Sequence, residues 1–225
     1  MDFNGVRLLV FDLDYTLADT SDGIVFCFNQ ARRMRGETEV EPKEIKARIG
    51  LPINETFALF GSADPAASRD QFRKLAREGA MAAMSSLLPG VADTLAQLSA
   101  RGYVLAVAST KSHAEIVAVL ERLGVALFFM ELVGSDEVRA AKPAPDPLLL
   151  VMQRTGFGPD QTAYVGDHLV DIQSARAAGV RVISVTGYGG PCPRETIIAA
   201  KPDAIIETLP GLLDLFQPDK VKGKR

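Results

Sequence analysis

Residues 6–17 read Val6-Arg7-Leu8-Leu9-Val10-Phe11-Asp12-Leu13-Asp14-Tyr15-Thr16-Leu17, and the architecture of the chain can be worked out from this stretch. Its first half is an apolar run typical of a buried strand. Side chains alternate along an extended chain, so Asp12 and Asp14 would share a face if that geometry continued. Two like charges at the edge of a core repel each other and resist desolvation, so they need a cation or a shared proton. A hard divalent cation with oxygen ligands is the simplest answer, and it indicates phosphate chemistry.

Short apolar runs rich in β-branched residues recur along the rest of the chain, at 103–108, 130–133, 162–165, 181–185 and 204–206. Helical patterns lie before, between and after them, at 91–100, 112–123, 147–155, 169–178 and 194–199. This alternation of strands and helices predicts an α/β, Rossmann-like fold, in which a parallel sheet carries helices on both faces.

The alternation stops between about residues 21 and 86, where only helical periodicity remains. Apolar residues at helical spacing indicate two helices, one with Ile24, Val25, Phe28, Ala31 and Met34, the other with Phe72, Leu75, Ala76, Gly79 and Ala83. Turn residues at 50–52 and 61–65 separate the helical segments. We therefore predict a core domain formed by residues 1–18 and 87–225, and a small helical domain, 19–86, inserted after the first strand. The two crossings between them would make a natural hinge.

Polar side chains follow several of the predicted strands. Ser109-Thr110-Lys111 follows the second strand, and Gly166-Asp167-His168 follows the fourth, with Asp171 one helical turn further on. Lys142 stands in a proline-rich loop before the fourth strand. Each residue alone has an ordinary explanation as a helix cap, a turn residue or a solvated charge. Because parallel strands end at one edge of their sheet, these residues should converge with the aspartate pair into a site that binds a metal and an anion.

Taken together, the motif Asp12-x-Asp14-x-Thr16-Leu17, the strand-end Ser109, the Lys142-Pro143 loop and Gly166-Asp167-x-x-x-Asp171 resemble the four signatures of the haloacid dehalogenase superfamily of phosphohydrolases. The resemblance covers essentially the whole chain, because the helical insertion occupies the position of the family's cap. Residues 12–20, 50–52 and 142–147 are most similar to the phosphoglycolate phosphatase-like group.

The resemblance implies a chemical role for each matched carboxylate. Asp12 would be the nucleophile that attacks phosphorus and becomes an aspartyl phosphate. Asp14 would protonate the leaving alcohol and later deprotonate the hydrolytic water. Mg²⁺ would be held by Asp12, the backbone carbonyl of Asp14 and Asp167, with Asp171 as a further ligand or as the residue that orients them.

The resemblance also implies residues that hold the substrate. Ser109 and Lys142 would bind the phosphoryl oxygens, and Lys142 would offset the charge of Asp12. Thr16 and Thr110 are expected to add further contacts to the phosphate or the substrate. A second anionic group could meet basic residues near the loop at 50–52, whose ordinary role would be a solvated helix face: Lys43, Lys46 and Arg48.

Three positions depart from the family pattern. Tyr15 stands where glycine is common, so we expect altered selectivity with the chemistry retained. His168 replaces the usual serine or threonine, and its ordinary role would be a hydrogen bond to the backbone. Ala141 replaces a frequent glycine before the lysine, which we regard as minor.

The leading expectation is a Mg²⁺-dependent phosphatase that hydrolyses the phosphomonoester of a small metabolite similar to phosphoglycolate. A β-phosphoglucomutase-like sugar phosphate mutase is the enzymatic alternative, because such mutases share the cap type and all four signatures. The non-enzymatic alternative is a phosphate-sensing or receiver-like module, which also gathers carboxylates at strand ends.

The composition excludes several other classes of protein. The net charge of −3 over 225 residues provides no basic surface for nucleic acid, and the one concentrated basic run is at 220–225. No apolar run reaches the roughly 18 residues that a membrane helix needs. Cys27 and Cys192 match no metal or redox spacing. We expect a cytoplasmic monomer or homodimer that binds neither nucleic acid nor membranes.

Overall fold

The main sheet of the computed structural model, which describes residues 3–217, has six strands. They lie in the order β5-β4-β1-β6-β7-β8 and all pair in parallel. Their bounds are β1 (Leu8–Phe11), β4 (Val104–Ala108), β5 (Phe129–Val133), β6 (Thr162–Gly166), β7 (Arg181–Val185) and β8 (Ala204–Ile206). The predicted α/β fold is confirmed. The basic run at 220–225 lies outside the described residues.

Strand β1 lies at the centre of the sheet, with all four of its residues buried. Leu9 and Phe11 pack into an apolar cluster on one face. Leu8 and Val10 pack into a second cluster on the other face, as the alternation of side chains along a strand requires. Both faces of β1 are therefore covered by helices, which explains why its sequence is apolar without interruption.

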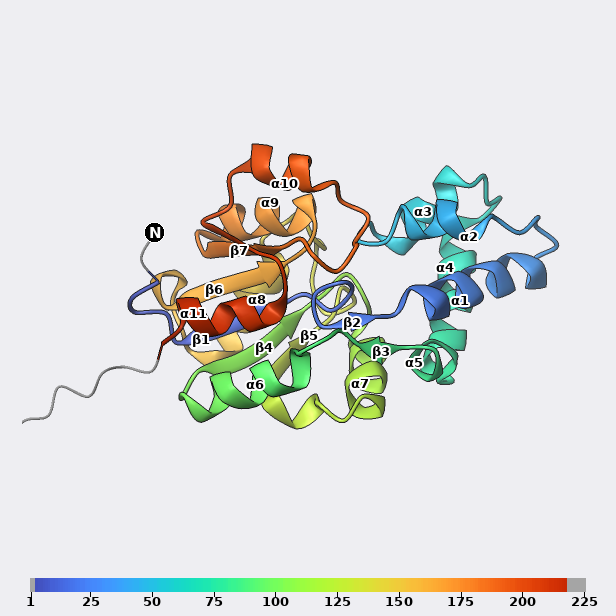
Figure 1. Cartoon of the computed structure of the whole chain (residues 1–225). Coiled ribbons are helices and arrows are strands. Elements are labelled where there is room, and N and C mark those ends of the chain that lie inside the picture. Colours follow the sequence, from blue (N-terminus) through green and yellow to red (C-terminus); the bar gives the residue numbers. More distant parts are fainter. Residues whose placement is uncertain (1–2, 218–225) are drawn as a thin grey trace, which may run out of the picture.

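The helices form the two outer layers around this sheet (Figure 1). The first cluster includes residues of α6 (Val91–Ala100), α7 (His113–Arg122) and α11 (Leu212–Leu215). The second includes residues of α8 (Asp146–Thr155), α9 (Leu169–Ala178) and α10 (Arg194–Ala200). Short 3₁₀ turns lie at Ala126–Phe128, Pro159–Gln161 and Leu209–Gly211.

The segment between β1 and α6 forms a group of helices at one end of the sheet (Figure 1). These helices are α1 (Ser21–Met34), α2 (Pro42–Lys46), α3 (Ile53–Leu59), α4 (Pro65–Arg77) and α5 (Ala80–Ala83). They share an apolar cluster of their own, in which the rings of Phe28 and Phe57 stack with centroids 4.2 Å apart. The second helix predicted here is wrong at Gly79, because this glycine adopts a left-handed conformation (φ +92°) and separates α4 from α5.

Two short antiparallel strands, β2 (Ala18–Asp19) and β3 (Ser86–Leu87), connect the helical insertion to the sheet. Ala18 pairs with Leu87 and Asp19 with Ser86. At two residues each, these strands are too short to leave a periodic pattern in the sequence. The predicted boundaries at 18/19 and 86/87 both fall inside this ribbon, and we propose it as the junction between two domains.

The insertion lies against the core. The Arg73 guanidinium of α4 donates a hydrogen bond to the Ser135 hydroxyl after β5, with Nη2 and Oγ 3.1 Å apart. A Cβ placed on Gly50 would come within 3.2 Å of the His168 ring, so this loop approaches the core closely. Within residues 3–217, no helix has the length and apolar character needed to cross a bilayer.

Candidate active site

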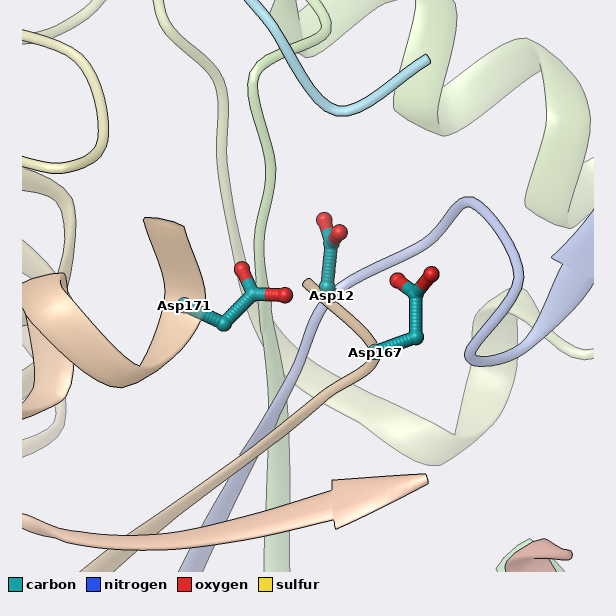
Figure 2. A group of neighbouring side chains, drawn as sticks. All are labelled: Asp12, Asp167 and Asp171. Carbon is teal, nitrogen blue, oxygen red and sulfur yellow. The ribbon is translucent and has the colours of Figure 1, made fainter. Parts of the chain in front are cut away.

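Three buried carboxylates meet at the carboxyl edge of the sheet, beside the point where the strand order reverses around β1. Asp12 directly follows β1, Asp167 directly follows β6, and Asp171 lies in the first turn of α9. One potential ligand atom from each lies within 4.8 Å of the others. Figure 2 shows Asp12 between the other two side chains. Because Phe11 pairs with both Val107 and Val165, the register brings the ends of β1, β4 and β6 to one level.

The Lys142 ammonium is shared among these groups. Its Nζ lies 2.9 Å from Asp12 Oδ1 and 2.7 Å from Asp171 Oδ1, and it donates a hydrogen bond to Tyr164 Oη at 2.9 Å. Tyr164 in turn donates to the carbonyl of Ala108 at 2.8 Å. Lys142 is only 1% exposed, so the predicted loop residue is a buried ion-pair partner instead of a solvated charge.

Burial raises the pKa of Asp12 to about 6, although Lys142 pulls in the opposite direction, and the charges of Asp171 and Asp14 add to the increase. Burial likewise raises the pKa of Asp167 well above its ordinary value, with Asp171 and Asp12 adding to it. Burial lowers the pKa of Lys142, but the carboxylates of Asp12 and Asp171 outweigh this effect and raise it overall. One ammonium therefore faces several buried carboxylates, and their oxygen-rich cluster fits a hard divalent cation.

The two outer carboxylates differ in their contacts. Both oxygens of Asp171 are engaged, because Oδ1 contacts Lys142 and Tyr164 while Oδ2 accepts a hydrogen bond from the His168 amide at 2.9 Å. Asp167 has no hydrogen bond or ion pair within the described part of the chain. A cation would thus meet a free carboxylate at Asp167, whereas Asp171 is fitted to orient Lys142.

Asp14 lies apart from this cluster, because β1 ends at Phe11 and the chain then turns. Its Oδ1 accepts a hydrogen bond from the Thr20 hydroxyl and lies 3.2 Å from Lys111 Nζ. Asp14 and Lys111 are both buried and line a narrow cavity of about 40 Å³. The extended geometry that would have put Asp12 and Asp14 on one face does not continue, and Tyr15 has a left-handed φ of +52°.

The other predicted substrate-binding residues are distributed around two cavities. Thr110 lines both the narrow cavity and a larger one of about 390 Å³, and Lys142 lines the larger one. Arg48 lines the narrow cavity with an exposed side chain. Ser109 is buried, and its hydroxyl accepts a hydrogen bond from the Lys111 amide at 3.4 Å. The Thr16 hydroxyl is buried and has no hydrogen-bond partner within residues 3–217.

Two further positions have ordinary structural contacts. Lys46 forms an ion pair with Asp22, with Nζ and Oδ1 2.6 Å apart, so it is engaged on the surface of the insertion. The His168 ring accepts a hydrogen bond from the Val170 amide at 3.3 Å and caps α9. Burial lowers the pKa of His168, which favours the neutral ring that this hydrogen bond requires.

Sequence reasoning assigned no role to Lys111, Thr20 or Tyr164. Lys111 directly follows Ser109 and Thr110, so its position at a strand end was an available signal. Thr20 reaches Asp14 because the chain turns back after β1, and Tyr164 has the sequence signature of an ordinary strand residue in β6. Neither of these two contacts is visible in the spacing of residues.

Comparisons with known proteins identify the family of the chain. A sequence model of the family described as "Haloacid dehalogenase-like hydrolase" matches residues 9–185. "Probable phosphatase IndB" of Dickeya dadantii (strain 3937) is 36% identical over 207 residues, which cover 89% of each chain. Phosphoglycolate phosphatase of Escherichia coli O157:H7 is 31% identical over an alignment 243 residues long, which covers 94% of this chain and 92% of that protein. A solved structure of a haloacid dehalogenase-like family hydrolase from Streptococcus pneumoniae superposes with a TM-score of 0.84 at 26% identity, covering 95% of this chain and 99% of the other.

Proposed function

The chain belongs to the haloacid dehalogenase-like hydrolase family, and we propose that it is a phosphoric monoester hydrolase for a small phosphorylated metabolite, acting through an aspartyl phosphate at Asp12. The observation that carries the proposal is the setting of Asp12: a buried carboxylate at the end of the central strand, 2.9 Å from the Lys142 ammonium. A carboxylate that approaches an anionic phosphate is repelled, so catalysis requires such neutralising groups nearby.

We propose Mg²⁺ as the cofactor. Asp12, Asp167 and the backbone carbonyl of Asp14 would hold it, with Asp171 nearby to orient the cluster. The supporting observation is the free, buried carboxylate of Asp167 beside Asp12, with ligand atoms within 4.8 Å. When bound, Mg²⁺ supplies positive charge that neutralises the carboxylates and the phosphoryl oxygens.

In the proposed reaction, the Asp12 carboxylate attacks phosphorus, so that an oxygen–phosphorus bond forms at Asp12 as the bond to the leaving oxygen breaks. Asp14 donates its proton to that leaving oxygen. It then takes a proton from the water that attacks the aspartyl phosphate, which regenerates Asp12 and releases phosphate. Thr20 and Lys111 both contact Oδ1 of Asp14, and this leaves Oδ2 as the oxygen that carries the proton.

Ser109, Thr110 and Lys142 would hold the phosphoryl oxygens, and the buried Thr16 hydroxyl, which has no partner within residues 3–217, would add a further contact to the phosphate or the substrate. Residues 19–86 would act as the cap that excludes water and selects the leaving group, over a core of residues 1–18 and 87–225. A substrate similar to phosphoglycolate is our specific proposal. Its support is the similarity over almost the full chain to a phosphoglycolate phosphatase.

The test is phosphate release from a panel of phosphorylated metabolites, with Mg²⁺ and with excess EDTA. We expect Mg²⁺-dependent turnover that falls by at least about 10³-fold in Asp12→Asn, because the nucleophile is lost. Asp22→Asn is the matched control, since Asp22 is an exposed aspartate on α1. Turnover that survives both EDTA and Asp12→Asn would contradict the proposal.

The same panel separates the alternatives. A mutase would interconvert sugar phosphates faster than it releases phosphate, and a sensing module would bind phosphate with no turnover at all.

A further inference from the structure

The larger cavity is lined by side chains that the proposed reaction at Asp12 does not use. It measures about 390 Å³ and lies where the helical insertion meets the core, with side chains from α3, α4 and the loops after β4 and β5 around it. This volume is in the range of small-molecule sites, which span about 300–1,000 Å³. The narrow cavity beside Asp14, at about 40 Å³, has room for only about three water molecules. The larger cavity is therefore the space in which most of a ligand would fit.

Three arginines line this cavity: Arg69 and Arg73 of α4, and Arg139 of the loop after β5. Arg73 uses Nη2 to donate to Ser135, whereas its Nε is buried and has no hydrogen-bond partner within residues 3–217. An unsatisfied buried guanidinium nitrogen is costly, and an anion is the acceptor that would satisfy it. Arg73 is thus oriented and still has donors to offer.

The charge balance of the cavity favours an anion. Arg139 is exposed and forms no ion pair among the described residues, whereas Arg69 is partly satisfied by Asp70, with Nη2 and Oδ1 2.8 Å apart. Among the described residues, Glu55 is the one carboxylate that lines the cavity. Three guanidinium groups and one lining carboxylate give the cavity an excess of positive charge, which attracts an anion. The paired N–H donors of each planar guanidinium group match the oxygens of phosphate and carboxylate.

The same cavity is also lined by Thr110 and Lys142, which belong to the proposed phosphoryl site. One small molecule could therefore contact the arginines and the phosphoryl site at once. We propose that the arginines of this cavity, Arg69, Arg73 and Arg139, bind a second anionic group of the substrate, so that the substrate class is a phosphomonoester that also carries a second phosphate or a carboxylate. This inference rests on the proposed function for the identity of the first group.

Direct binding tests the site without any need for turnover. Isothermal titration would compare α,ω-alkanebisphosphonates of two to six carbons with the alkylphosphonates of the same chain length, at constant Mg²⁺. Hydrogen bonds from guanidinium to an anion predict that the best bisphosphonate binds at least about 10-fold more tightly than its monophosphonate. This difference should disappear in the double variant Arg69→Met/Arg73→Met.

One control isolates the effect. Lys74→Met removes one positive charge from the exposed side of α4 and should change nothing. The proposal is overturned if the wild-type chain shows no such preference, or if the preference survives in the double variant. An arginine-dependent preference in a chain that hydrolyses no phosphomonoester supports the anion site and contradicts only the proposed function.

Discussion

Tyr15 lies between Asp12, the proposed nucleophile, and the helical insertion, in a backbone conformation that few side chains tolerate. Its φ is +52°, and its ring packs against the apolar cluster of helices α1–α5. The left-handed region costs a residue with a Cβ about 1–2 kcal/mol, whereas glycine adopts it freely. The backbone strain of Tyr15 is therefore offset by its contact with the insertion, and this contact joins the loop after Asp12 to helices α1–α5.

This strain predicts an unusual order of stability. Tyr15→Ala and Tyr15→Gly lose the same ring, but only the alanine retains the strain. We expect Tyr15→Gly to be the more stable of the two by about 1 kcal/mol, opposite to the usual effect of glycine. Urea unfolding followed by circular dichroism measures the difference. If the alanine variant is equal or more stable, the left-handed conformation does not strain this residue.

Replacing Asp167 with asparagine should increase the stability of the metal-free protein and reduce its activity. Burial raises its pKa, so in the metal-free protein the folded state disfavours the ionised form, and stability is lost as pH rises from the carboxylate's ordinary value towards the folded pKa. Asp167→Asn should stabilise the metal-free protein by roughly 1–3 kcal/mol at pH 7.5, with a smaller gain at pH 4.5. Thermal unfolding in EDTA at both pH values is the measurement, and an equal effect at the two values would contradict the electrostatic cause.

The site residues that could be predicted from the sequence are those whose position follows from the ends of the strands. Asp12, Asp167 and Asp171 were found in this way, because parallel strands place their carboxyl ends at one edge. Arg73 could not be assigned, because its contact with Ser135 depends on how the helical insertion packs against the core. That packing is a property of tertiary structure that local spacing does not encode.

At the scale of elements, α1 approaches α5 at a single glycine. A Cβ on Gly23 would lie 2.7 Å from the Met81 carbonyl oxygen and 2.8 Å from its Cα, which is closer than side chains pack. In an ordinary helix, replacing glycine by alanine stabilises by about 1 kcal/mol. At this position the methyl group must push the two helices apart, so a residue of any larger size disturbs the insertion.

Gly23→Ala should therefore destabilise the protein by about 1–3 kcal/mol. Chemical denaturation measures the change, and Ser99→Ala on the exposed face of α6 is the control, with an expected effect within about 0.5 kcal/mol. A stabilising effect of Gly23→Ala would show that the helices separate freely.

The elements themselves were largely predictable. Predicted and observed strands differ by at most two residues at their ends, because apolar runs with β-branched residues carry a strong signal. The break at Gly79 and the β2–β3 ribbon could not be predicted. The break depends on a left-handed glycine inside a helical pattern. The ribbon depends on the pairing of two strands that have only two residues each.

At the scale of the whole molecule, the binding of Mg²⁺ should increase the stability of the folded protein. In the metal-free protein, the folded pKa of Asp12 of about 6 lies above its ordinary value of 3.8, so stability falls as pH rises between these values. The proposed Mg²⁺ would bind the ionised form and offset this loss. Mg²⁺ at about 100 times its dissociation constant should add about 2.7 kcal/mol, or roughly 5–10 °C in Tm.

We expect this Tm increase over an EDTA control at pH 7.5 and a clearly smaller one at pH 5, where protons compete for Asp12. Differential scanning fluorimetry measures both. Asp167→Asn should abolish most of the increase, whereas Asp22→Asn should preserve it. An increase that is independent of pH would mean that the metal binds elsewhere.

The pairing of β1 also determines the order in which a nascent chain can fold. Leu8 pairs with Val104 on one side and with Thr162 on the other, so the central strand is synthesised before both of its partners and gains the second one only 154 residues later (162 − 8). At about 5–20 residues per second, this wait lasts roughly 8–30 s. Helices α1–α5 need only neighbouring residues for their own cluster, so we expect them to fold during synthesis while the apolar strand that leads to Asp12 is still unpaired. The proposed cap would thus be folded before the proposed catalytic edge of the sheet is complete.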